Sequence, residues 1–298
     1  MRACKERERG LSPLLVILTV LAGMSARGAI QTILPQEFAP GIISTGHEFG
    51  ISFTPDGREA YFSRFAVNQA THIFRSKLID GIWQQPEKIS ISADTWSDLD
   101  PFVSFDGKHL FFISTRSDND TDSSGKKDMD IWVAERHGTD WIAPRRVENV
   151  NSAGKEGYPG VAKDRTMYFF SDRKDGPGNN AIYESRLING VYSAPVLMPS
   201  AINSGASNTS PFIARDGRTL LFYSNRIGGY GKADLYVSFK RHGKWTDASN
   251  LGPVVNSGDS DYNPAVSPDG RLFFFGRNSK LYVVPTSAIA GLRAKLFR

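Results

Sequence analysis

Residues 267–277 have the sequence SPDGRLFFFGR, in which an Asp-Gly turn is followed by an aromatic run that ends in arginine. Variants of this pattern occur five times along the chain. The aspartates of the turns are Asp56, Asp106, Asp164, Asp216 and Asp269. The arginines that end the aromatic runs are Arg64, Arg116, Arg173, Arg226 and Arg277. A pattern of this length that recurs at intervals of 50 to 58 residues identifies a repeat protein.

Each copy carries signals for three strands, and four of the five copies carry a signal for a fourth. An Asp-Gly turn between apolar residues indicates a β-hairpin, because glycine accepts a positive φ and aspartate bonds the turn backbone. The third copy is degenerate and has Arg165 where the others have glycine. A third strand follows the arginine, as in DIWVA around Trp132, and in four copies a fourth strand follows, as in TDWIAP around Trp141. Four short strands at this period predict a propeller blade.

Proline stands five residues before the turn aspartate in four copies, and we expect it at the beginning of the first strand. These prolines are Pro101, Pro159, Pro211 and Pro264, and Ile51 takes their place in the first copy.

The fifth copy lacks a fourth strand, because residues 286–297 have helical rather than strand spacing. Residues 35–44 resemble the end of the other fourth strands, so we predict that they pair with the third strand near Leu281 and close the ring. The predicted fold is one all-β domain, residues 30–298, with five four-stranded blades and a short C-terminal helical segment. The repeats span 47–96, 97–154, 155–206, 207–259 and 260–285, with the closing strand at 35–45. The C-terminal segment is either a docking helix or a cap over the last blade.

The first 29 residues have the features of a secretory signal peptide. A basic region with Arg2, Lys5, Arg7 and Arg9 precedes an apolar run from Leu11 to Met24, and small residues follow near Gly28. A retained anchor is the alternative, although the apolar run is shorter than the roughly 20 residues that a spanning helix needs. We expect a periplasmic or secreted monomer with no membrane span after cleavage. The single cysteine, Cys4, lies in the signal, so disulfides and thiol catalysis are excluded from the mature chain.

The formal net charge of +5 belongs mainly to the signal peptide. Residues 1–28 hold five Lys or Arg and two Asp or Glu, which leaves 31 basic against 29 acidic residues. No basic stripe remains to neutralise phosphates, so we expect no nucleic acid partner.

The repeat resembles the WD-like propeller repeat of TolB-type proteins over about residues 35–285. The residues that carry the resemblance are SPDGRLFFFGR and the longer SNRIGGYGKADLYVSFKRHGKWTDASNLGPVVNS. The resemblance implies a bacterial cell envelope protein, often a periplasmic scaffold that binds a protein or a ligand at one face of the ring. The chain differs from TolB in having five copies rather than six and no α/β domain before the propeller, so roles that depend on that domain are not implied.

Polar residues recur at the start of each first strand and are expected at one mouth of the channel. Those three residues before the proline position are Glu48, Asp98, Glu156, Asn208 and Asp261, and those one before it include Asp100, Tyr158, Ser210 and Asn263. His47 and Trp96 lie beside them in the connections between blades. This collar could bind a sugar or a cation such as calcium. We favour the alternative that each acid pairs with a repeat arginine, because carboxylates on one axis repel each other unless they are paired.

Two functions are compatible with these residues. We favour a non-catalytic binding scaffold for a protein or glycan partner in the cell envelope, with no catalytic residue, no metal and no cofactor. The alternative is a carbohydrate-active enzyme in which Glu48, Asp98, Glu156 and Asp261 supply the acid and the base or nucleophile. Two cavity carboxylates without arginine partners would favour the enzyme, and five acid–arginine pairs would favour the scaffold.

Overall fold

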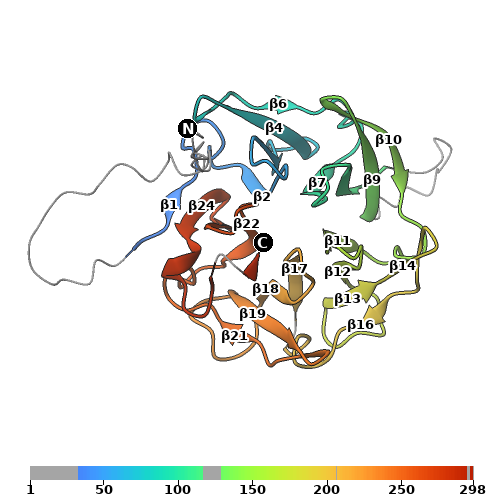
Figure 1. Cartoon of the computed structure of the whole chain (residues 1–298), viewed down its shortest axis with the longest axis vertical. Coiled ribbons are helices and arrows are strands. Elements are labelled where there is room, and N and C mark those ends of the chain that lie inside the picture. Colours follow the sequence, from blue (N-terminus) through green and yellow to red (C-terminus); the bar gives the residue numbers. More distant parts are fainter. Residues whose placement is uncertain (1–32, 117–128, 206, 294–295, 298) are drawn as a thin grey trace, which may run out of the picture.

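The computed structural model describes residues 33–116, 129–205, 207–293 and 296–297. Five antiparallel sheets stand around a common centre like the blades of a propeller (Figure 1). The predicted five-bladed all-β propeller is therefore confirmed. The whole of the predicted signal peptide lies outside the described residues, and none of the described helices is long and apolar enough to cross a membrane.

In each blade the first three strands run outward from the channel in sequence order. The innermost strands are β2 (Glu48–Phe53), β7 (Asp98–Val103), β11 (Glu156–Val161), β17 (Asn208–Ile213) and β22 (Tyr262–Val266). The second strands are β3 (Glu59–Arg64), β8 (His109–Ser114), β12 (Met167–Ser171), β18 (Thr219–Ser224) and β23 (Leu272–Arg277). The third strands are β4 (His72–Ile79), β9 (Asp130–His137), β13 (Ala181–Ser185), β19 (Asp234–Arg241) and β24 (Lys280–Pro285).

The outer strands are the least regular part of the blades. Only blade two has a long one, β10 (Asp140–Arg146). Elsewhere among the described residues the outer edge consists of two-residue pieces, which are β5 (Ile82–Trp83), β6 (Glu87–Lys88), β16 (Val196–Leu197), β20 (Lys244–Trp245), β21 (Ser249–Asn250) and the hairpin of β14 (Leu187–Ile188) with β15 (Val191–Tyr192). Short, interrupted edge strands offer little template for pairing with another chain.

The turn aspartates act as the sequence predicts. The Oδ1 atom of each one accepts a hydrogen bond from the backbone amide two residues later, as Asp56 does from Arg58 at 3.0 Å. The next residue is left-handed in every copy, with φ between 68° and 75°. In the third copy that residue is Arg165, so one turn adopts this conformation without glycine.

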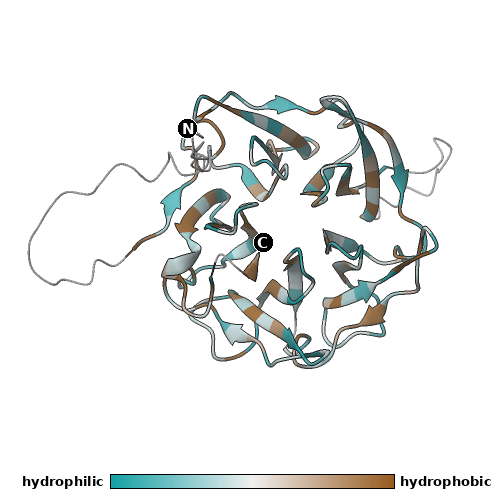
Figure 2. Cartoon of the chain, viewed as in Figure 1, coloured by the Kyte–Doolittle hydropathy of each residue, from teal (hydrophilic) through white to brown (hydrophobic). Residues whose placement is uncertain are grey.

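The hydrophobic core consists of five clusters, one between each pair of neighbouring blades. Because the second strands lie inside blades that are covered on both faces, they are apolar along nearly their whole length. Figure 2 shows hydrophobic residues along the strands of the ring. The cluster between blades one and two joins Tyr61 and Ile73 to Phe112, Trp132 and Trp141. Each blade therefore depends on both neighbours for burial of its faces.

The predicted closing strand is confirmed. β1 (Gln36–Glu37) pairs antiparallel with β24, with Gln36 opposite Val283 and Glu37 opposite Tyr282. Phe38 is fully buried and packs edge-to-face on Phe274, with ring centroids 4.9 Å apart. The N-terminal segment thus completes blade five before the chain enters blade one.

Two details differ from the expectations. Pro101, Pro159 and Pro211 lie in the middle of their strands, which begin three residues earlier. The proline instead lies within a bulge, where the pairing with the second strand is interrupted. The C-terminal segment contains a 3-10 turn, Thr286–Ala288, in place of the predicted helical segment, and Ile289, Leu292 and Phe297 after it are buried against blades four and five. The segment is therefore a cap and not a free docking helix.

Candidate functional site

The two faces of the ring carry different connections. Because neighbouring strands are antiparallel, the starts of the innermost strands and the connections between second and third strands lie on one face, which we call the loop face. The Asp-Gly turns lie on the opposite face, which we call the turn face. All the candidate residues predicted from the sequence lie at the loop face or in the channel below it.

The repeat arginines hold the polar residues that begin the innermost strands. Arg64 Nε lies 2.7 Å from Glu48 Oε1, Arg116 Nη2 lies 2.7 Å from Asp98 Oδ2, and Arg277 Nε lies 2.6 Å from Asp261 Oδ1. Arg173 Nη2 lies 3.0 Å from Glu156 Oε1. All four acids are fully buried. We call each arginine with its partner a clamp.

Each arginine also fixes the connection that leads into its own blade. The guanidinium groups donate to backbone carbonyls of Ile42, Ile91, Val150, Ile202 and Val255 at 2.6 to 3.1 Å. Each guanidinium also lies over aromatic rings of the second and third strands, as Arg173 does over Phe169 and Tyr183. A buried carboxylate, a backbone carbonyl and two ring faces account for the recurrence of arginine at this position.

In three clamps the carboxylate has several further donors. Glu48 accepts the backbone amides of Thr45, Gly46 and His47. Glu156 accepts Ser152 N and the hydroxyls of Ser152 and Ser171. Asp261 accepts the amide and the hydroxyl of Ser257. Together with the arginine, these donors occupy most of the lone pairs of the three carboxylates.

The clamps of blades two and four differ from these three. In blade two Asp98 Oδ1 is buried without a hydrogen-bond partner. In blade four the acid is replaced by Asn208, whose Oδ1 accepts from Arg226 at 3.1 Å and from the Ser224 hydroxyl at 2.9 Å. Burial lowers the pKa of Arg226, which has no carboxylate in its clamp to offset the loss of water.

A second polar ring lies on the channel axis, deeper than the clamps. It consists of the residues at the bulges, Gly50, Asp100, Tyr158, Ser210 and Asn263, and we call it the axial ring. All five are left-handed, with φ between 51° and 58°. Four of them are not glycine, and such residues rarely adopt this conformation without local compensation. The axial ring lines a cavity of about 30 Å³, whose remaining walls are Ile51, four prolines and two phenylalanines.

Asp100 is the only carboxylate that lines the axial cavity among the described residues. It is 5% exposed, and its Oδ1 atom has no hydrogen-bond partner. Burial raises its pKa to about 7, although hydrogen bonding from Tyr158 acts in the opposite direction. Ser210 and Asn263 bond to each other, with Ser210 Oγ donating to Asn263 Oδ1 at 3.0 Å.

The channel is closed on the turn face by the C-terminal segment. Phe297 lines the lower part of the channel with Phe53, Phe102 and Phe212, and the ring centroids of Phe212 and Phe297 are 6.4 Å apart. The last described residues accordingly lie at the centre of the ring (Figure 1). A ligand of the channel would therefore enter from the loop face.

The loop face also presents side chains that the sequence did not single out. Val67 and Tyr230 are 74% and 54% exposed, and Ile227 is fully exposed. Of the predicted residues, His47 is exposed and packs edge-to-face on Phe65 at 5.3 Å, whereas Trp96 is half-buried. The only sequence signal for the new residues is their position in loops such as IGGYG, where a packed strand is not expected.

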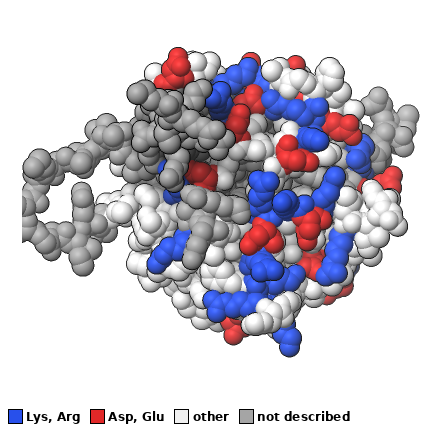
Figure 3. Space-filling view, viewed as in Figure 1, with Lys and Arg blue, Asp and Glu red and all other residues white. Residues whose placement is uncertain are grey.

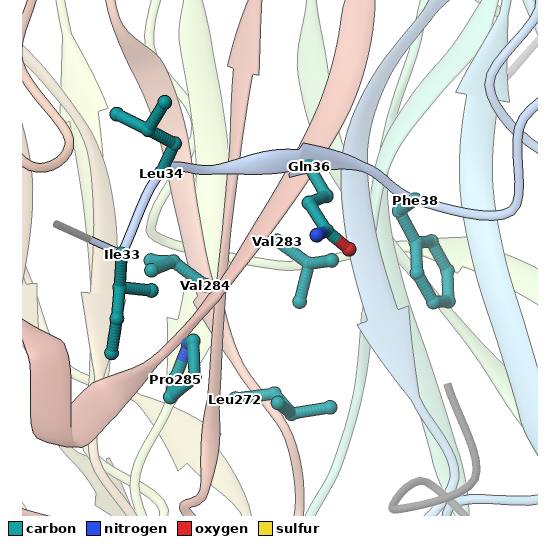
Figure 4. A pocket seen from close by; sticks show the side chains of 8 residues that line it. All are labelled: Ile33, Leu34, Gln36, Phe38, Leu272, Val283, Val284 and Pro285. Carbon is teal, nitrogen blue, oxygen red and sulfur yellow. The ribbon is translucent and has the colours of Figure 1, made fainter. Parts of the chain in front are cut away.

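Other surfaces are less suggestive of a site. Figure 3 shows one face of the ring, on which basic and acidic side chains are interspersed and do not form a patch of one sign. A small apolar groove of about 40 Å³ lies beside the closing strand on the outside of blade five, with the exposed Ile33 and Leu34 at one end (Figure 4). It is remote from the channel, and we assign it no function.

The fold and the channel define a five-bladed β-propeller. No family model matches the sequence, and no curated protein matches it. The similar solved structures include the "putative TolB" of Agrobacterium tumefaciens, with 17% identity over 76% of this chain and 69% of that chain and a TM-score of 0.50. They also include a GH43 endo-arabinanase from Bacillus licheniformis, with 15% identity over 82% and 96% of the two chains and a TM-score of 0.51.

TolB from Acinetobacter baumannii has 16% identity over 80% of this chain with a TM-score of 0.49, and this chain spans 54% of its length. At these identities the comparisons show the fold alone. The resemblance to TolB-type propellers is thus confirmed structurally, while an enzyme with the same fold is equally similar.

Proposed function

We propose that this chain is an exported, non-catalytic binding propeller that presents its loop face to a partner in the cell envelope. The observation that carries the proposal is the pairing of four of the five carboxylates of the predicted collar, Glu48, Asp98, Glu156 and Asp261, with arginine. The usual glycoside hydrolysis needs two carboxyl groups on either side of a bound sugar. Of the described residues that line the axial cavity, Asp100 is the only one with a carboxylate, and the cavity volume of about 30 Å³ is far below the 300 Å³ or more that ligand pockets usually have.

A protein partner fits the loop face better than a glycan. The exposed Val67, Ile227 and Tyr230 are apolar or aromatic side chains at loop positions, and such side chains are enriched in the buried centres of protein interfaces. A sugar needs a concave site with several directed hydrogen bonds, which these loop positions do not supply.

Export is part of the proposal and is supported by the sequence of the first 29 residues. Mass spectrometry of the chain isolated from the envelope fraction of an expressing bacterium tests it. A mature N-terminus near residue 29 or 30 is expected, and an intact Met1 in the cytoplasmic fraction would contradict export.

The binding function is tested with purified full-length mature protein on protein and glycan arrays derived from a bacterial envelope. The variant Ile227→Ser with Tyr230→Ser alters the loop face, and Ile188→Ser with Val191→Ser is the matched control on the outer hairpin of blade three. We expect saturable protein binding that the first variant loses and the control retains. Release of reducing sugar by the wild type, abolished by Asp100→Asn, would instead establish a hydrolase.

A further inference from the structure

The axial ring places one buried carboxylate in a small cavity. Asp100 is nine-tenths buried or more, and its Oδ1 atom is without a partner. Apolar rings make up most of the cavity wall and offer no hydrogen bonds to replace the water that a charged carboxylate loses on burial. These rings belong to Pro101, Pro159, Pro211, Pro264, Phe102 and Phe212. A buried carboxylate under these conditions needs a proton or a cation.

The other polar members of the axial ring offer neutral oxygens. Tyr158 and Ser210 contribute hydroxyl groups and Asn263 an amide carbonyl, which still has one lone pair after it accepts the Ser210 hydroxyl. The cavity volume of about 30 Å³ is enough for one water-sized species.

We propose that the axial ring binds a single monovalent metal cation of about the size of sodium, with Asp100 as its charged ligand. One negative charge and a few neutral oxygens match one positive charge. Calcium takes six to eight oxygens, commonly with several carboxylates, and the described residues contain no group of three or more His, Cys, Asp or Glu that could hold a metal. The cation site does not depend on the loop-face partner. The cation proposal can therefore be wrong while the proposed binding function is right, and the binding function can be wrong while the cation proposal is right.

The strained backbone supports a binding role for the ring. Asp100, Tyr158, Ser210 and Asn263 all turn left-handed at the same depth of the channel, which brings four polar side chains to one axis. A merely structural bulge could be made with glycine, as Gly50 makes it in blade one. A cation bound by several blades at once would also join them at the axis.

Thermal unfolding in metal-free buffer at pH 8 tests the proposal, with choline chloride holding the ionic strength constant. We expect about 100 mM sodium chloride to raise the Tm of the wild type by about 2–5 °C relative to choline. Asp100→Asn should remove this rise, and asparagine is well suited to the left-handed backbone at this position. Asp80→Asn, at an exposed left-handed turn, is the matched control and should keep the rise.

A second measurement does not depend on stability. The ²³Na relaxation rate should show saturable broadening in the presence of the wild type and of Asp80→Asn, and none with Asp100→Asn. Equal Tm values in sodium and choline would overturn the proposal, as would an equal rise in Asp100→Asn. A larger rise with millimolar calcium than with sodium would overturn the assignment to a monovalent ion.

Discussion

Arg226 is the one repeat arginine whose clamp contains an amide in place of a carboxylate. Asn208 supplies only a neutral oxygen, and its Nδ2 atom is buried without a partner. The other four arginines each have a buried acid. Blade four therefore has a clamp that one substitution can complete.

We expect Asn208→Asp to raise the free energy of unfolding at pH 7 by about 1–2 kcal/mol, because a charge-assisted pair replaces a neutral acceptor. Urea unfolding measures the change. Asp98→Asn, which turns the clamp of blade two into that of blade four, is the mirror-image control and should lower the same free energy. A destabilised Asn208→Asp protein would refute the assigned role of the clamps.

Asp100 should give stability a characteristic dependence on pH. Its pKa is about 7 in the folded chain against 3.8 for the ordinary side chain, so the folded state holds the proton over the interval in which the unfolded state loses it. The free energy of unfolding should therefore fall as pH rises from about 4 to about 7, by at most about 4 kcal/mol. Tyr158, which faces Asp100, has a pKa raised well above its ordinary value and stays protonated throughout.

Urea unfolding across this pH range in choline buffer isolates the contribution of Asp100 as the difference between the wild type and Asp100→Asn. Parallel curves for the two proteins would show that Asp100 ionises normally.

For single residues, the sequence predicts side-chain interactions better than it predicts backbone conformation. The turn aspartates and clamp arginines could be predicted because each recurs with its neighbours in all five copies. The residues of the axial ring other than Gly50 were predicted as part of the collar, but their left-handed backbone was not, because Asp100, Tyr158 and Ser210 precede proline, which favours extended backbone at that position. Tertiary packing of the bulges overrides this local preference.

The closing strand is the element on which ring closure depends. Phe38 fills the space between Phe274 of blade five and Trp83 of blade one, with the centroid of its ring 5.6 Å from that of Trp83. We expect Phe38→Ala to cost about 3–5 kcal/mol in the free energy of unfolding. Leu34→Ala, in the same segment but 70% exposed, is the control and should change little. Similar stability of the two variants in chemical denaturation would mean that the segment contributes nothing to closure.

The C-terminal segment should contribute less, because it packs on blades four and five without completing a sheet, as the closing strand does. Phe297 is buried beside Phe212 and Val266. Phe297→Ala is expected to lower the free energy of unfolding by about 1–3 kcal/mol, while Arg293→Ala, at an exposed position, should leave it unchanged. A thermal scan of both variants is sufficient, and an unchanged Tm for Phe297→Ala would argue against the cap.

Among the elements, the closing strand was predictable because its sequence resembles that of a fourth strand, although no first three strands precede it in the chain. The fragmentation of the outer strands was not, since WQQP and YSAP contain the same aromatic and proline signals as the longer WIAP strand of blade two. Edge strands have one neighbour only, so their length depends on packing more than on local sequence.

The whole molecule is a closed ring of mutually dependent blades. Five inter-blade clusters form the core, and each clamp fixes the connection that enters its blade. In this arrangement the four arginine-paired carboxylates of the collar serve the scaffold, which leaves the loop face free for binding. The central claim is therefore that these carboxylates are structural.

A double-mutant cycle on Glu156 and Arg173 tests this claim most directly. The free energies of unfolding of the wild type, Glu156→Gln, Arg173→Met and the double variant would be measured in urea at pH 7. We predict a coupling energy of about 2–4 kcal/mol, because removing either partner leaves the other buried charge uncompensated. A coupling energy below about 0.5 kcal/mol, with Glu156→Gln as stable as the wild type, would contradict the account and return Glu156 to the list of candidate functional carboxylates.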